Sequence, residues 1–156
     1  MRMIRRTTHF ALVALALAVS CRSVPSGQSP DHSQSIGASS SRAAVEMYME
    51  AMRKGDFALI GNIWGSHEGL ARDRYSREEF EKRAFVVSCY LGWAGYRIDA
   101  DRPAVDNGRT VVVQSTPPGQ HQEATLRIEQ DSAGRWFVAG AELAGLSPDR
   151  CTKGSS

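Results

Sequence analysis

The side chains that could take part in acid–base or metal chemistry are few and widely spaced. His67 and His121 are the only histidines beyond residue 41, and both lie in polar segments without apolar periodicity. A zinc site needs three or four ligands, so two isolated histidines predict no metal. We expect both to be solvated loop residues. His121 and Glu123 would matter for chemistry only if they faced a pocket together.

Phosphate-binding and nucleophile motifs are also missing. The sequence contains no Gly-rich phosphate loop, no Gly-x-Ser-x-Gly and no Ser-x-x-Lys, which are the patterns that position phosphates or an activated serine. We therefore expect no cofactor.

The charge balance argues against nucleic acid as a partner. The chain has 19 basic and 17 acidic side chains, and three of the basic ones lie in the first 21 residues, which leaves 16 basic and 17 acidic. A nucleic-acid-binding domain carries a basic surplus gathered on one face. Mixed charges of this kind are typical of an ordinary solvated surface.

The N-terminus has the pattern of a cleaved export signal. Arg2, Arg5 and Arg6 precede an uncharged run from Phe10 to Val19, and small residues follow. That order is typical of a signal peptide, here residues 1–20. The apolar run is shorter than the ~18 residues needed to cross a bilayer.

The four residues Ala18-Val19-Ser20-Cys21 resemble the cleavage box of bacterial lipoproteins. The resemblance implies cleavage before Cys21, acyl chains such as palmitate on that cysteine, and a membrane anchor in the cell envelope. Arg22 in place of an aspartate favours the outer membrane, facing the periplasm, if the cell is Gram-negative. The alternative is cleavage by the general signal peptidase, with no lipid attached.

The remaining chain divides by composition into a tether, a domain and a tail. Residues 21–41 are rich in serine and lack aromatic residues, so they cannot bury enough surface to offset their ordering entropy. We expect them to form a flexible tether. Residues 42–151 are long enough for one domain with a modest core, and residues 152–156 are expected to be a disordered tail.

Cysteine counting predicts one disulfide. Three cysteines less a lipidated Cys21 leave Cys89 and Cys151, and an exported domain folds in an oxidising compartment. We expect a bond between these two. The alternatives are two buried thiols or a catalytic Cys89, although no histidine lies close to Cys89 in sequence to activate it.

Apolar periodicity predicts three helices followed by strands. A spacing of 3.6 residues indicates helices over 42–54 and 57–64. The pair Ser76 and Glu79 forms a capping box that opens a third helix over 77–91. The segment between the second and third helices is expected to be a polar loop.

After Gly92 the apolar period changes to two, which is typical of strands. Strands are expected over residues 95–102, 109–115, 123–130 and 135–143. Short links between them predict an antiparallel meander. The sequence therefore predicts an α+β fold, with N-terminal helices packed on a curved four-stranded antiparallel sheet.

Two local patterns resemble the cone-shaped α+β superfamily of nuclear transport factor 2, ketosteroid isomerase and scytalone dehydratase, which has a cystatin-like cone fold. The first is Val-x-x-Tyr-x-x-Ala-x-x-x-Gly-Asp and the second is Gly-Arg-Trp-x-Val, and here they fall on Val45, Tyr48, Ala51, Gly55, Asp56, Gly134, Arg135, Trp136 and Val138. The resemblance implies a sheet curled around the helices, a conical pocket between them, and in many members a dimer formed through the sheet.

The resemblance leaves three functions open. The isomerase uses a tyrosine, a carboxylate base and a protonated acid in an apolar pocket. Tyr48 matches the tyrosine, Asp73 lies one residue from the base position, and Leu126 stands where the acid should be. We therefore prefer a non-catalytic module over a pocket enzyme that uses Tyr48 and Asp73. Such a module would bind a small apolar or amphipathic ligand in the cone, or an envelope protein or second copy on the outer sheet face. That face would expose Val112 and Phe137. The third function is a structural interaction domain with a filled cone.

Overall fold

The computed structural model describes residues 36–117, 120–148 and 151. The export signal, Cys21 and the tail 152–156 lie outside the described residues. Within the described part, no helix is long and apolar enough to cross a membrane.

Three capped helices form where the sequence predicts them. Helix α1 spans Ser41–Lys54 and begins at Ser40, whose side chain accepts a hydrogen bond from the backbone N–H of Ala43. Gly55 ends it with a φ of 68°, a left-handed conformation that glycine adopts without a steric penalty.

Helices α2 and α4 begin in the same way. Helix α2 spans Phe57–Ile63, and the carboxylate of Asp56 accepts from the N–H of Leu59. Helix α4 spans Arg77–Leu91, and Ser76 accepts from the N–H of Glu79. Each cap satisfies a backbone donor that the first turn leaves unpaired.

The segment expected to be a polar loop forms three short elements instead. They are β1 (Gly65–Ser66), β2 (Gly69–Leu70) and α3 (Ala71–Arg74), and β1 pairs antiparallel with β2. Leu70 and Ala71 are buried. Elements of two to four residues are too short to show a period, so the loop prediction was wrong for a physical reason.

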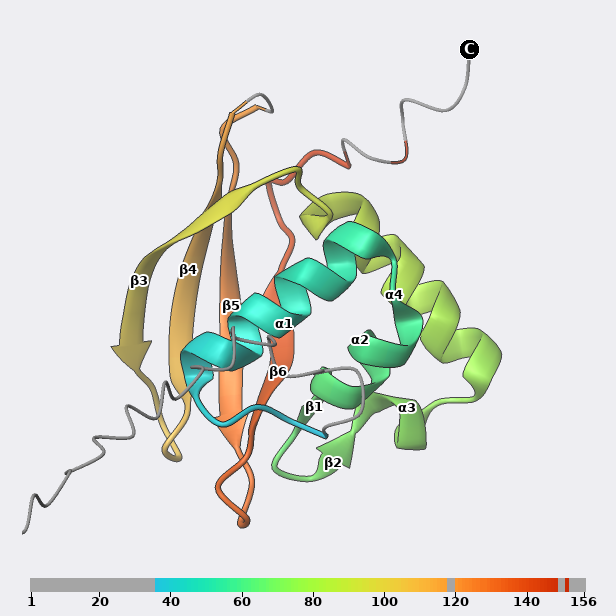
Figure 1. The fold of residues 1–156 in the computed structure, drawn as a ribbon, viewed down its shortest axis with the longest axis vertical. Coiled ribbons are helices and arrows are strands. Elements are labelled where there is room, and N and C mark those ends of the chain that lie inside the picture. The colour runs from blue at the N-terminus through green and yellow to red at the C-terminus, as the bar shows by residue number, and fades with distance from the viewer. Residues whose placement is uncertain (1–35, 118–119, 149–150, 152–156) are drawn as a thin grey trace, which may run out of the picture.

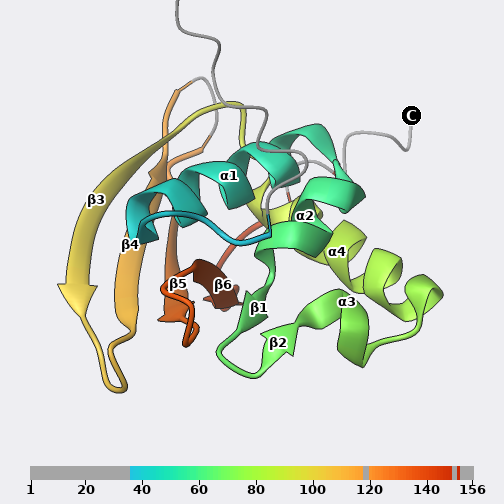
Figure 2. The same ribbon diagram turned by 60° about the horizontal axis from the view of Figure 1, so that its bottom comes forward.

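The α+β prediction is confirmed. Strands β3 (Tyr96–Pro103), β4 (Arg109–Ser115), β5 (Glu123–Gln130) and β6 (Trp136–Glu142) form one antiparallel sheet in the order β3-β4-β5-β6. Figure 1 shows α1 lying across one face of this sheet, with α2 and α4 beyond it. Figure 2 shows β1, β2 and α3 grouped near α2 and α4, on the helical side of the molecule.

The core lies between the helices and the inner face of the sheet. Alternation along β5 buries Ala124, Leu126 and Ile128, because successive side chains of a strand point to opposite faces. Helix α1 contributes Tyr48 and Met52 from the other side, and all of these side chains belong to one hydrophobic cluster.

The domain begins earlier than the expected tether boundary at residue 41. Ala38 and Trp136 exchange two backbone N–H···O bonds of 2.9 Å, and the N–H of Gly37 donates to the carbonyl of Asn62 at 2.8 Å. Residues 36–40 therefore pack against the domain. Gly37 and Ala38, which make these contacts, carry no periodic signal, because backbone hydrogen bonds hold this segment in place.

Candidate functional site

The interior expected to form a conical pocket is packed with apolar side chains. The side chain of Tyr48 is 1% exposed, and the core side chains of Met49, Met52 and Ile60 are equally or more deeply buried. Burial raises the pKa of Tyr48 well above that of a free phenol, so its hydroxyl stays neutral. An isomerase site would need further polar groups converging on this hydroxyl.

The structure does not bring Asp73 to Tyr48. Asp73 lies on α3 with its side chain 70% exposed, and its Oδ1 is 3.8 Å from Nε of Arg72. It lines a groove on the surface of the helical layer, in which Tyr48 takes no part. The proposed pairing of Tyr48 with Asp73 is therefore corrected by the fold, which places one in the core and the other in solvent.

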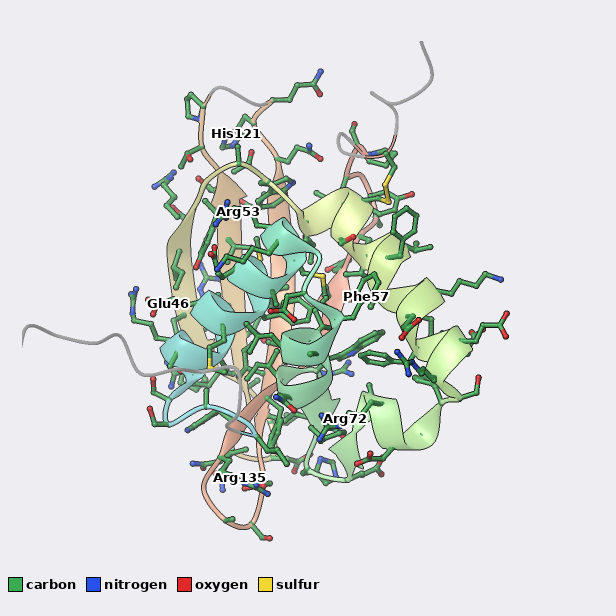
Figure 3. The ribbon with its side chains drawn as sticks, turned by 45° about the vertical axis from the view of Figure 1, so that its right-hand side comes forward. Glu46, Arg53, Phe57, Arg72, His121 and Arg135 are labelled. Atoms are coloured by element: carbon green, nitrogen blue, oxygen red, sulfur yellow. A yellow bond between two sulfur atoms is a disulfide. The ribbon has the colours of Figure 1, made fainter. Side chains whose placement is uncertain are left out.

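The two histidines lie elsewhere. His67 is in the turn between β1 and β2, and its Nδ1 lies 2.7 Å from Oε2 of Glu129. This hydrogen bond raises the pKa of His67. His121 is exposed in the loop between β4 and β5, and Figure 3 shows it at the opposite end of the molecule from Arg72. The candidate residues Tyr48, Asp73, His67 and His121 thus form no common pocket.

Cys89 and Cys151 are joined by a disulfide, with a Cα–Cα distance of 5.3 Å. The bond ties the last turn of α4 to the chain beyond β6. Thiol chemistry at Cys89 is then unavailable while the bond is intact.

The outer face of the sheet does not expose Phe137, which corrects that part of the expected apolar patch, whereas Val112 is half-buried there. Phe137 is only 3% exposed, because the segment at Gly37 packs directly over its ring. Arg97 donates to Oε1 of Gln114, and Nε2 of Gln114 donates to Oε2 of Glu123 at 2.8 Å. Such a hydrogen-bonded polar row across three strands offers little for apolar docking.

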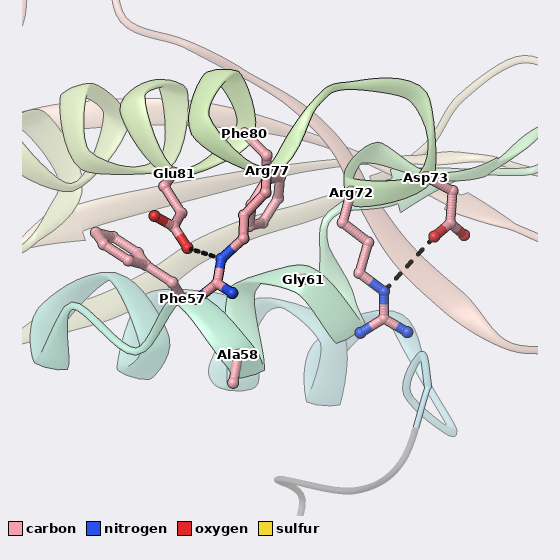
Figure 4. A pocket seen from close by; sticks show the side chains of 8 residues that line it. All are labelled: Phe57, Ala58, Gly61, Arg72, Asp73, Arg77, Phe80 and Glu81. Carbon is pink, nitrogen blue, oxygen red and sulfur yellow. Dashed lines mark hydrogen bonds and ion pairs between the residues drawn. The ribbon is translucent and has the colours of Figure 1, made fainter.

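The helical layer carries a better candidate site, a surface groove of about 490 Å³ between α2, α3 and α4. That volume lies within the ~300–1,000 Å³ range of small-molecule sites. Its lining combines two aromatic rings with two arginines and two carboxylates, as Figure 4 shows: Phe57, Ala58 and Gly61 from α2, Arg72 and Asp73 from α3, and Arg77, Phe80 and Glu81 from α4.

Arg72 is the best-fixed charged group of the groove. Its Nη1 donates to Oδ1 of Asn62 at 2.5 Å, and Asn62 is 8% exposed. Its stem lies over Gly61, where a Cβ would come within 3.1 Å of Cδ of Arg72. The absence of a side chain at Gly61 therefore makes room for this arginine.

Arg77 is differently placed. Its Nε lies 2.8 Å from Oε1 of Glu81, and its side chain is 90% exposed. This is an ordinary i,i+4 pair on a helix surface, whose net energy is small. Figure 4 shows the pair near Phe57 at one side of the groove.

Sequence reasoning did not select Arg72, Gly61 or Phe57. Gly61 carried the one usable signal, because a glycine inside a helical pattern costs about 1 kcal/mol relative to alanine and suggests a packing reason. A search of known protein families, curated proteins and solved structures finds nothing that matches this chain.

Proposed function

We propose that this chain is an exported lipoprotein, anchored through lipid on Cys21, whose domain is a non-catalytic binding module. The ligand site is the groove between α2, α3 and α4. The observation that carries this proposal is the contrast between the interior of the domain and this surface groove. The interior is packed with buried apolar side chains, whereas the groove is open and joins apolar and charged groups.

The pocket-enzyme alternative has less support. An enzyme of the isomerase or dehydratase type needs polar groups that converge on one bound substrate. Here Tyr48 is buried and Asp73 is exposed on α3.

The alternative of a structural interaction domain with a filled cone has a specific observation in its favour. Phe85 and Val86 on α4 are 54% and 46% exposed. Neighbouring exposed apolar side chains are frequent at protein interfaces. A partner protein or a second copy would then dock on the helical layer rather than on the polar outer face of the sheet.

The groove proposal is tested with the exported chain carrying Cys21→Ser, which keeps the whole domain but lacks the lipid site. Amide NMR spectra are recorded while a set of small amphipathic compounds is added. We expect shifts that centre on Gly61 and Phe80 and saturate with concentration. Saturable shifts confined to the core strands, or none with any compound, would contradict the proposal.

The anchor is tested separately by comparing membrane fractions of the original chain with those of Cys21→Ser. We expect the substitution to move the protein from the membrane to the soluble fraction and to abolish fatty-acid labelling. Membrane association that is unchanged by Cys21→Ser would rule out the lipid anchor.

A further inference from the structure

We propose that the groove selects a ligand with a single carboxylate on an apolar body. The carboxylate pairs with Arg72, and the apolar body lies against Phe57 and Ala58. This inference rests on the proposed function, because it names the ligand class of the same groove.

The guanidinium of Arg72 is held in place before any ligand arrives. Asn62 accepts from Nη1 at 2.5 Å, and the stem of Arg72 packs over Gly61. A planar group fixed at one end loses little rotational freedom when it pairs with an anion. An arginine that is already oriented therefore binds an anion more tightly than a freely moving surface arginine.

The anchoring contact leaves the better anion-binding edge of the guanidinium available. Asn62 engages Nη1, whereas Nε and Nη2 form the opposite edge of the guanidinium, whose two N–H bonds are parallel. Among the described residues, none accepts a hydrogen bond from Nη2, and Nε has only the 3.8 Å contact with Asp73, which is 70% exposed. Loose exposed pairs contribute little energy, so a carboxylate can displace Asp73 and bind both donors, as arginine–carboxylate pairs commonly do.

The charges of the lining favour one negative charge over two. The groove contains two arginines and two carboxylates, so its formal net charge is zero. Arg77 is 90% exposed and pairs with Glu81 at 2.8 Å, whereas Arg72 is the cation that a buried side chain, Asn62, also holds in place. A monoanion pairs with that one group, whereas a phosphate dianion would bring its second charge close to Asp73.

Beside these charged side chains, the groove has apolar lining residues. Phe57 is half-buried and Ala58 is exposed, so these two side chains of α2 supply most of the apolar surface, whereas Phe80 is only 5% exposed. Burying an alkyl or aromatic ligand body here removes apolar surface from water. The ligand is therefore amphipathic, with its carboxylate at the α3 side and its body directed toward α2.

The test measures the affinities of matched probes by calorimetry on the Cys21→Ser chain. The probes are octanoate, 1-octanol and octyl phosphate, which share a tail and differ in head group, together with N-acetylphenylalanine as a mimic of a peptide end. We expect octanoate to bind at least about tenfold more tightly than octanol, since hydrogen bonds to charged groups are among the stronger ones. Octyl phosphate should be the weaker anion. Preference for octanoate or for N-acetylphenylalanine distinguishes a free fatty acid from a chain terminus as the source of the carboxylate.

The role of Arg72 is tested with Arg72→Gln and Arg72→Lys, compared with Arg74→Gln as the matched control. Arg74 is a neighbouring exposed arginine whose Nη1 lies 3.6 Å from Glu68, and it is not in the groove lining. Both Arg72 variants should lose about tenfold in octanoate affinity. The control should bind as the parent does, and octanol binding should not change in any variant.

The outcomes separate this inference from the proposed function. Octanol binding in the groove as tightly as octanoate, or Arg72→Lys binding octanoate as the parent does, would overturn the carboxylate inference and leave the groove as a binding site. If no probe or library compound shifts the groove resonances, the proposed function itself fails. The comparison of octanoate with octanol needs no variant, so it decides the matter even if Arg72→Gln does not fold.

Discussion

Removing the Cys89–Cys151 bond should cost a large part of the stability of this domain. The two cysteines are 62 residues apart. In the chain-entropy model, closing a loop of that length lowers the entropy of the unfolded chain by an amount worth about 4 kcal/mol at 25 °C. The total free energy of unfolding of a small domain is only ~5–15 kcal/mol, so the disulfide contributes a large share of the stability.

The expected shift in melting temperature follows from the size of the domain. For a domain of about 110 residues, each kcal/mol corresponds to roughly 4 °C. Replacing both cysteines with serine should therefore lower Tm by about 15 °C. Cys89 is buried, so a serine hydroxyl there adds a desolvation cost of its own, and Cys89→Ala with Cys151→Ala is the cleaner pair.

The assay uses urea unfolding followed by circular dichroism on the Cys21→Ser chain, in which two cysteines remain. Thiols are counted in the denatured chain before and after reduction, and we expect none and then two. The reduced parent serves as the control for side-chain effects, because it loses the bond and keeps both sulfur atoms. A loss below about 1 kcal/mol in the reduced parent would refute the entropic reasoning, and equal thiol counts would show that no bond forms.

Three further predictions concern the groove, a surface pair and the core. Gly61→Ala should leave the free energy of unfolding unchanged or higher, since alanine favours a helix by about 1 kcal/mol. The substitution should also weaken octanoate binding, because the new Cβ would lie 3.1 Å from Cδ of Arg72. Urea unfolding measures the stability and calorimetry measures the binding. A variant that is less stable than the parent but binds octanoate equally well would contradict this prediction. The hydrogen bond to Glu129 raises the pKa of His67 in the folded protein. The contribution of His67 to the free energy of unfolding is therefore full below the free-histidine pKa of ~6.5 and is lost as pH rises through the raised pKa of the folded state. The stability deficit of His67→Gln should therefore be larger at about pH 5.5 than at about pH 8.5, and equal deficits would argue against the pair. Burial raises the pKa of Tyr48 in the folded protein. The parent should therefore lose stability above about pH 10, where Tyr48 ionises in the unfolded chain, and Tyr48→Phe should lose less. Identical dependence of stability on pH in the two proteins would show that Tyr48 is not buried.

Glu129 contributes to the pH dependence from the acid side. Partial burial raises the pKa of its carboxyl, but hydrogen bonds from the side chain and backbone of His67 outweigh that effect and lower the pKa overall. Its stabilisation is therefore present above the ordinary carboxyl pKa and is lost as pH falls through the lowered value. The His67–Glu129 pair should stabilise the fold most in mildly acidic solution, between the ordinary carboxyl pKa and the free-histidine pKa of ~6.5.

Elements with local signals were predictable from the sequence. Asp56 and Ser76 cap α2 and α4 as expected, and Gly55 ends α1. A cap needs only one side chain and the N–H groups two or three residues further on, so the pattern lies within a few adjacent letters. The strands were predictable for a similar reason, since alternation along β5 already separates its inner and outer faces.

Elements that depend on distant partners were not predictable. The pairing of Ala38 with Trp136 joins residues far apart in sequence through backbone atoms alone, and backbone atoms leave no mark in the sequence. The same pairing places Gly37 over Phe137, which turned a side chain expected on an exposed face into a buried one.

The sequence by itself determined the α+β class, because that class follows from short apolar repeats, and it predicted an export signal from local composition. The tertiary structure alone decided that Tyr48 lies in the packed core and that Asp73 lies in solvent. It also decided that Arg72 meets Asn62 over Gly61. Whether a cone stays open depends on how side-chain volumes from several elements fill a shared space. Whether a groove forms depends on which elements meet at the surface. Neither the filling of the cone nor the position of the groove can be read from residues that are adjacent in the chain.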